Sequence, residues 1–193
     1  MTPEVGMQIL RYHQRVFDFL RQKPVFYEKH QASISAIELL VRRKLPDSVA
    51  EWFSLEGARS LIRFNDDHVL PADLFQLSPN PLFGNDPRWT LGELESDNIV
   101  VRAHWNKPES YLIEDGLLKI VVENQGVCQW AVELDNSDED PSVWMQLNEN
   151  NERWRPVANT FSDFVFGRVW DTWILHSAPF TLTSIGKLFS YCY

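Results

Sequence analysis

The fold is decided by residues 117–135, which read LLKIVVENQGVCQWAVELD. The first six of these residues are almost entirely apolar. Such a run is typical of a strand covered on both faces, and it predicts a strand at 117–122 in the middle of a sheet. Apolar and more polar residues alternate after the turn, which predicts a half-buried strand at 127–135. We expect these two strands to be neighbours, with Trp130 largely buried beneath a helix.

Further strands are predicted on both sides of this pair. The acidic stretch 135–140 is typical of a turn, and an apolar run at 143–147 returns beside the half-buried strand. Prolines and glycines in residues 71–98 predict a long connection with short helical turns. The other predicted strands lie at 99–105 and 111–113, and a predicted hairpin has its arms at 60–64 and 69–70 around the polar turn 65–67.

Three helices are predicted before the strands. Thr2 and Pro3 suit the first positions of a helix, and apolar residues continue at helical spacing to residue 23, ahead of Pro24. The second and third helices are predicted from two pairs with the form of capping boxes, and the third helix is expected to end at a glycine. These signals are Ser35 with Glu38, Ser48 with Glu51, and Gly57.

One helix is predicted after the strands. Thr160 can cap it, and Asp163 is favourably placed in its first turn. Helices gathered before and after a run of strands predict an α+β fold, with helices on one side of a mostly antiparallel sheet. The residues available for burial in this helix are Phe161, Phe164, Val165, Val169 and Trp173.

Composition indicates one globular domain over residues 1–193. The chain is 44% hydrophobic, which is enough to build a core without metal or disulfide. Its two cysteines, Cys128 and Cys192, give no disulfide framework. The N-terminus has no signal-peptide pattern, and no apolar run approaches the ~20 residues that span a bilayer. We expect a cytoplasmic protein without a membrane partner.

The net charge of −9 is concentrated in the middle of the chain. Residues 1–48 carry 8 basic and 5 acidic side chains, residues 49–155 carry 8 and 20, and the remainder carries 2 of each. An acidic surface repels nucleic acid and anionic lipid and attracts basic proteins. The alternative is that the acidic residues only keep the protein soluble.

No pattern for catalysis or metal binding is found in the sequence. The five histidines are scattered singly, and the two cysteines form no C-x-x-C. Neither a nucleophile elbow nor a phosphate-binding loop is present. Acidic doublets fall in predicted turns, where exposure is the expected state. We therefore predict no catalytic residues, no metal site and no cofactor.

Four stretches of the chain resemble the SUKH superfamily, also called the Smi/Knr-like family. Residues 37–58, with Leu45 and Pro46, resemble its opening helices, and residues 161–164 resemble the start of its final helix. Residues 123–130 resemble its E-N-Q-G-V-x-x-W strand, and residues 140–144 resemble its D-P-P-V strand start. The resemblance covers residues 33–175 and leaves 1–24 as an accessory helix and 176–193 as a tail. The matching motif residues are Leu45, Pro46, Glu123, Asn124, Gln125, Gly126, Trp130, Asp140 and Pro141.

This resemblance implies a mixed, strongly bent sheet and a binding role without catalytic residues. Many bacterial members are immunity proteins that neutralise toxins, often nucleases, and eukaryotic relatives are regulatory scaffolds. The expected function is therefore a protein-binding immunity protein whose partner is a basic toxin domain. A regulatory scaffold is the alternative, and an enzyme or small-ligand binder is the third. The candidate partner-binding residues are Asp66, Asp67, Asp135, Asp138, Glu139 and Asp140.

Overall fold

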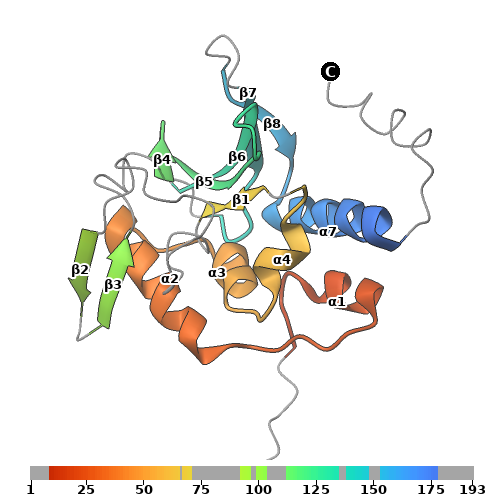
Figure 1. Cartoon of the computed structure of the whole chain (residues 1–193), viewed down its shortest axis with the longest axis horizontal. Coiled ribbons are helices and arrows are strands. Elements are labelled where there is room, and N and C mark those ends of the chain that lie inside the picture. The colour runs from red at the N-terminus through yellow and green to blue at the C-terminus, as the bar shows by residue number, and fades with distance from the viewer. Residues whose placement is uncertain are drawn as a thin grey trace, which may run out of the picture.

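The chain folds as an α+β protein, with helices packed against an antiparallel sheet (Figure 1). The computed structural model describes residues 9–65, 67–70, 92–96, 99–103, 112–134, 138–147 and 153–177. For 92–96, 99–103, 175–177, Lys29 and Leu40 it describes the backbone alone.

The main sheet has six strands in the order β1-β5-β6-β7-β8, with β4 also paired to β5. Every pairing in the described part of the chain is antiparallel, so the expectation of a mixed sheet is not met there. The pairs β4–β5, β5–β6, β6–β7 and β7–β8 have short connections, which suit antiparallel pairing, because a parallel pair needs a long crossover. The strands are β1 (His68–Val69), β4 (Ile113–Glu114), β5 (Leu117–Val122), β6 (Cys128–Glu133), β7 (Val143–Leu147) and β8 (Arg155–Ala158).

Strand β5 lies inside the sheet, as its apolar run predicts. All of its residues are buried, and it pairs with β6 from Leu117 opposite Glu133 to Val122 opposite Gln129. The predicted neighbours are therefore confirmed. Trp130 of β6 packs against Phe164 of helix α7 (Phe161–Ser177), with ring centroids 6.4 Å apart. It is half-buried rather than largely buried, even though the Arg168 guanidinium covers part of its ring, 4.9 Å from the ring centre.

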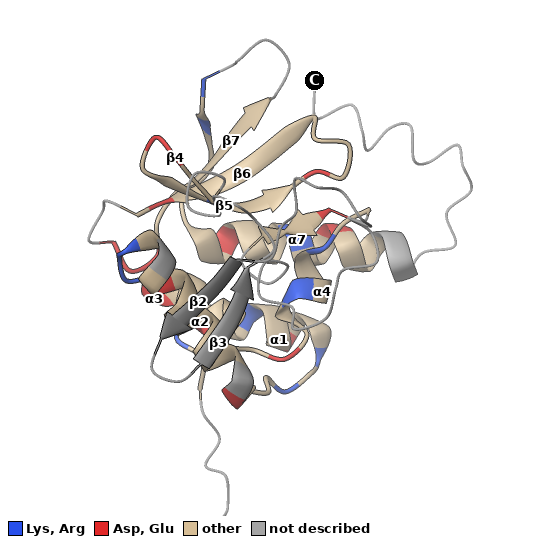
Figure 2. Ribbon diagram, turned by 60° about the vertical axis from the view of Figure 1, so that its left-hand side comes forward, with Lys and Arg blue, Asp and Glu red and all other residues tan. Residues whose placement is uncertain are grey.

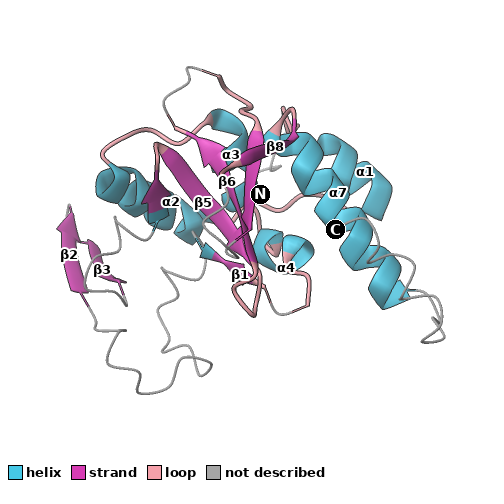
Figure 3. Cartoon of the chain, turned by 90° about the horizontal axis from the view of Figure 1, so that it is seen from above, coloured by secondary structure: helices cyan, strands magenta, loops and turns pink. Residues whose placement is uncertain are grey.

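Helices α3, α4 and α7 lie on one side of the sheet, and α1 lies beside α7 (Figures 1 and 3). One continuous cluster of buried apolar side chains joins these helices to β1, β5, β6 and β7. The helices before the sheet are α1 (Gln14–Leu20), α2 (Glu28–Val41), α3 (Asp47–Phe53) and α4 (Ala58–Ile62). Charged residues concentrate on helices and turns, whereas the ribbons of β5, β6 and β7 carry few (Figure 2).

The first predicted helix is much shorter than expected. Residues 11–13 are bends, and α1 begins only at Gln14. The cause is a remote contact, because the carboxylate of Glu51 binds the backbone N–H groups of residues 11–13. Residues 1–8 lie outside the described part, as does most of the connection 71–98 and everything after Ser177.

Neither predicted capping box forms. Helix α2 begins at Glu28, so Ser35 lies inside it, and Glu38 instead accepts a hydrogen bond from the backbone N–H of Leu45 at 3.1 Å. Helix α3 begins at Asp47 after the extended Pro46, without a side-chain cap. The Ser48 hydroxyl is buried and has no hydrogen-bond partner. The two glutamates of these pairs bind other segments instead: Glu38 binds residue 45, and Glu51 binds residues 11–13.

The hairpin predicted over residues 60–70 is wrong. Residues 58–62 form helix α4, and β1 pairs with β5 instead. A different hairpin joins β4 to β5 through Asp115 and Gly116, which both have positive φ. Strand β3 (Ile99–Ala103) confirms most of the strand predicted at 99–105. Its partner β2 (Gly92–Ser96) lies in the predicted connection, and the pair sits beside α2.

Among the described residues, none of the helices has the length and apolar character to cross a bilayer.

Candidate interaction face

The N-terminal segment of residues 9–20, here called the strap, lies against helices α3 and α7 (Figure 3). It inserts Leu10, His13, Val16 and Phe17 into the core, each at most 3% exposed. Its other side chains remain at the surface, close to the acidic turn of residues 138–140 and to α7. The strap therefore contributes to both the core and the exposed face.

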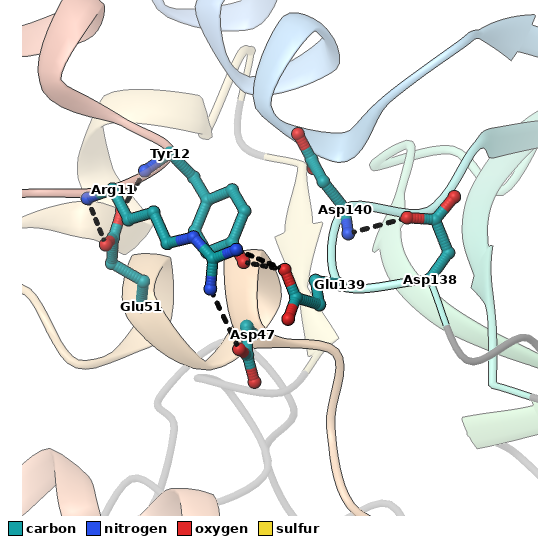
Figure 4. Close-up of polar contacts among 7 residues, drawn as sticks. All are labelled: Arg11, Tyr12, Asp47, Glu51, Asp138, Glu139 and Asp140. Carbon is teal, nitrogen blue, oxygen red and sulfur yellow. Dashed lines mark hydrogen bonds and ion pairs between the residues drawn. The ribbon is translucent and has the colours of Figure 1, made fainter.

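Glu51 of α3 fixes the start of the strap. Its carboxylate accepts hydrogen bonds from three consecutive backbone N–H groups, those of Arg11 at 2.7 Å, Tyr12 at 2.9 Å and His13 at 3.0 Å. Figure 4 shows the first two of these bonds. These N–H groups precede α1 and would otherwise lack partners. One side chain thus supplies the acceptor for a turn that lies about forty positions away in the sequence.

The acidic turn meets the strap in a mixed charge cluster. The Arg11 guanidinium pairs with Glu139 and lies 3.8 Å from Asp47, and the Tyr12 hydroxyl donates to Glu139 at 3.1 Å (Figure 4). Burial, reinforced by the hydrogen bond to Glu139, raises the pKa of Tyr12 to about 12. The side chains of Arg11, Asp47 and Glu139 are all more than half exposed, so each pair contributes ~0–1 kcal/mol to stability.

Asp67 is not a surface residue, contrary to its predicted place in an exposed turn. It is 1% exposed and pairs with Arg168 of α7, while the N–H of Asn124 donates to its carboxylate at 3.3 Å. Burial raises the pKa of Asp67, and the neighbouring Arg168 opposes that shift. The residue fastens the turn before β1 to α7.

Asp140 also has a structural role. Its carboxylate accepts hydrogen bonds from the backbone N–H of Ser162 at 3.0 Å and from the Ser162 hydroxyl at 2.6 Å. Thr160 accepts from the N–H of Asp163 at 3.1 Å, which is the predicted cap. Two side chains therefore satisfy the start of α7.

Two of the six candidate acids are exposed in the described structure. These are Asp138 and Glu139, both in the acidic turn. Asp66 and Asp135 lie outside the described residues. Among the described candidates, the exposed carboxylates belong to one turn, and Glu139 of that turn shares the Arg11 guanidinium with Asp47 of α3 (Figure 4).

The remaining motif residues build turns and core. Glu123 accepts hydrogen bonds from the N–H groups of Gln125 at 2.8 Å and Val127 at 3.2 Å, which closes the turn between β5 and β6. Gly126 has φ +73°, a conformation that favours glycine. Leu45, Pro46 and Pro141 are buried. The roles of these motif residues in turns and in the core are structural and do not require a bound partner.

The outer side of α7 carries a group of aromatic rings, here called the aromatic face, formed by Phe19, Phe166, Trp170 and Trp173. The Phe19 ring lies 5.7, 4.9 and 5.3 Å from those of Phe166, Trp170 and Trp173. Trp170 and Trp173 are 43% and 46% exposed, and their rings contact each other at 6.4 Å. The expected burial of Trp173 is therefore wrong, because this side of α7 faces away from the sheet.

Charged residues flank the aromatic face. Arg15 places its guanidinium 3.7 Å from the centre of the Phe166 ring and donates to Asp163 at 3.1 Å. Asp171 lies at the surface. Partial desolvation of its carboxyl group by the surrounding side chains raises its pKa, and the charge of Arg168 opposes this shift. Because Arg168 is bonded to Asp67, its charge is already shared with another carboxylate.

The sequence contained one signal for this face. Phe166, Trp170 and Trp173 are spaced at i, i+4 and i+7, which places them on one side of a helix. Phe19 could not be added from the sequence, because its contact with α7 spans about 150 positions.

Groups suited to metal chemistry are absent from the described residues, where no three His, Cys, Asp or Glu side chains gather. Cys128 is half-buried in β6. Comparison of the chain with protein-family models, with curated proteins and with solved structures gives no significant match.

Proposed function

We propose that this protein is a non-catalytic binding module, an immunity protein that neutralises a basic toxin domain, such as a nuclease, in the cytoplasm. Its binding surface is the aromatic face together with the acidic turn, which contacts the start of α7 through Asp140. The observation that carries this proposal is the exposure of Trp170 and Trp173, which contact each other at the surface of α7. The resemblance of the motif residues to immunity proteins supports the same function.

Exposed apolar residues are common when they occur singly, and Leu39 of α2 and Val157 of β8 are examples here. Rings that touch each other at the surface are different, because a contiguous apolar patch favours association with another surface. Tryptophan is also among the residues most enriched at the energetic centres of protein interfaces. The aromatic face therefore fits the centre of an interface.

The charges around this face favour a basic partner. Arg15 shows how a guanidinium fits here, since it stacks on Phe166 while it binds Asp163. The two exposed indoles offer the same cation–π contact to arginines of a partner. Asp171 supplies an exposed carboxylate on α7, and Asp138 and Glu139 supply two more in the acidic turn. The aromatic rings would provide most of the affinity, and the carboxylates would steer the encounter.

The proposal predicts a toxin gene beside the gene of this protein, and the toxin domain that it encodes is the binding partner in the test. Association rates are measured at two salt concentrations for the wild type and for Asp138→Asn/Glu139→Gln, which leaves the α7 cap at Asp140 intact. Slower association, and a weaker salt dependence than in the wild type, are expected for the variant, because salt screens exposed charges. The matched control is Glu28→Gln/Glu56→Gln, which removes two exposed carboxylates elsewhere.

Two further results would decide against parts of the proposal. Equal rates for the variant, the control and both salt concentrations would show that the acidic turn only aids solubility. A protein that binds many unrelated partners and gives no protection against the toxin would favour the regulatory scaffold.

The binding experiment also uses a chain that ends at Ser177. Tighter toxin binding by that chain would show that residues 178–193 compete for the aromatic face.

A further inference from the structure

His13 is the one histidine that is completely buried in the described part of the chain. Its ring lies between Trp52 of α3, 5.0 Å away, and Phe161 of α7, 5.7 Å away. The ring atom Nε2 lies 2.8 Å from the carbonyl oxygen of Ser48. Because a carbonyl only accepts hydrogen bonds, Nε2 carries the proton. The Nδ1 atom is buried and has no partner. The ring is therefore neutral.

The surroundings of His13 resist a second proton. The nearby buried polar atoms without partners are the Ser48 hydroxyl and the Trp52 indole nitrogen. The charged groups that act on His13 are Glu51 of α3 and Asp140 of the acidic turn. Burial lowers the pKa of His13, and this effect exceeds the opposing influence of the Ser48 carbonyl and of those two carboxylates. A protonated ring would place an unpaired N–H and a charge in the core.

His13 also occupies the centre of the strap. On one side of it, Arg11 pairs with Glu139 of the acidic turn, and on the other side Phe19 belongs to the aromatic face and Arg15 stacks on Phe166. Three apolar side chains, Leu10, Val16 and Phe17, must offset the ordering of the whole segment. A change in the charge of His13 therefore acts on a segment that crosses both parts of the proposed binding surface.

We propose that the strap is an acid-sensitive latch, in which protonation of His13 at Nδ1 releases residues 9–20 from α3 and α7. Release would remove Arg11 from Glu139 and Asp47, and Phe19 and Arg15 from α7. It would thereby expose more carboxylate and more of the helix surface. This inference goes beyond the proposed function, and its measurements need no partner.

The direction of the pH dependence follows from the two states of His13. A released histidine has a pKa of about 6.5, whereas the docked ring stays neutral to lower pH. Above about pH 6.5 neither state binds the proton, so docking has its full strength. Below that pH the released strap binds a proton that the docked strap does not. The docking equilibrium constant then falls by up to about tenfold per pH unit until the docked ring also titrates.

The test is amide hydrogen exchange of the full chain between pH 7.5 and pH 5, with protection factors corrected for the intrinsic pH dependence of exchange. The protection of α1 is expected to fall by up to about tenfold per unit below pH 6.5, while the protection of α2 changes little. His13→Gln is the comparison variant, because its amide can donate to Ser48 but does not titrate. Its α1 should keep constant protection over this range.

Constant protection of α1 in the wild type would overturn the proposal, and so would an equal loss in His13→Gln or in α2. If His13→Gln does not fold, an NMR titration of the wild-type ring decides the question. The latch requires that α1 loses protection in the same pH range in which His13 binds its proton. A His13 that protonates while α1 remains protected would contradict it.

Discussion

At the scale of single residues, several carboxylates in the described part of the chain accept hydrogen bonds from backbone N–H groups. Glu38 binds the N–H of Leu45, Glu51 binds three N–H groups of the strap, and Asp140 binds that of Ser162. Each contact fixes a turn or a helix start that has no internal partner. These acidic residues are therefore structural, and they do not add to the candidate binding surface.

The buried pair of Asp67 and Arg168 should be the most sensitive of these contacts. Asp67→Ala would leave the Arg168 guanidinium, only 12% exposed, without its carboxylate. We expect the free energy of unfolding to fall by about 3–5 kcal/mol, since an unpaired buried charge is costly. Urea denaturation measures this loss. Asp138→Ala, at an exposed position, should change stability by at most about 0.5 kcal/mol.

A double variant provides the control. Asp67→Ala/Arg168→Met removes both charges, so it should be more stable than Asp67→Ala alone. If Asp67→Ala unfolds at the same urea concentration as the wild type, the buried pair does not hold β1 to α7 in solution.

At the scale of elements, the sequence predicted the helices and strands that are specified by their own residues. Strands β5, β6 and β7 follow from apolar periodicity, and the start of α7 follows from Thr160. The early start of α2 was missed, because Tyr27 stands at its N-cap without a side-chain cap. One available signal was overlooked, since Asp115-Gly116 is a favourable two-residue hairpin turn and joins β4 to β5.

The same substitution, glycine to alanine, should have opposite effects on stability at two positions. Gly126, in the turn between β5 and β6, has φ +73°, and Gly126→Ala should lower stability by about 1–2 kcal/mol. Gly167 is helical and exposed within α7, with open space where a Cβ would lie. Gly167→Ala should raise stability by about 1 kcal/mol.

Thermal unfolding of both variants beside the wild type measures the two shifts. The expected order of melting temperature is Gly167→Ala, wild type, Gly126→Ala. If both substitutions shift the melting temperature in the same direction, the backbone conformation at one of the two positions differs from this description.

At the scale of the whole molecule, the fold class could be predicted from the sequence, but the candidate surface could be predicted only in part. The acidic turn was identified because its charges are adjacent in the chain. The aromatic face was not, because Phe19 meets α7 only in the folded protein. Likewise, Asp67 has the sequence context of a surface turn, and only its contact with Arg168 shows that it is buried.

The central claim is that the protein binds its partner through the aromatic face, and the dissociation constant of the toxin complex tests it most directly. Calorimetry compares the wild type with Trp170→Ala and Trp173→Ala, and with the control variants Leu39→Ala and Val157→Ala, whose residues are 48% and 46% exposed. An interface centre typically loses at least ~2 kcal/mol per truncated tryptophan. Each tryptophan variant should therefore bind about 30-fold more weakly, while the controls bind as the wild type does. Tryptophan variants that fold and bind with unchanged affinity would contradict the account.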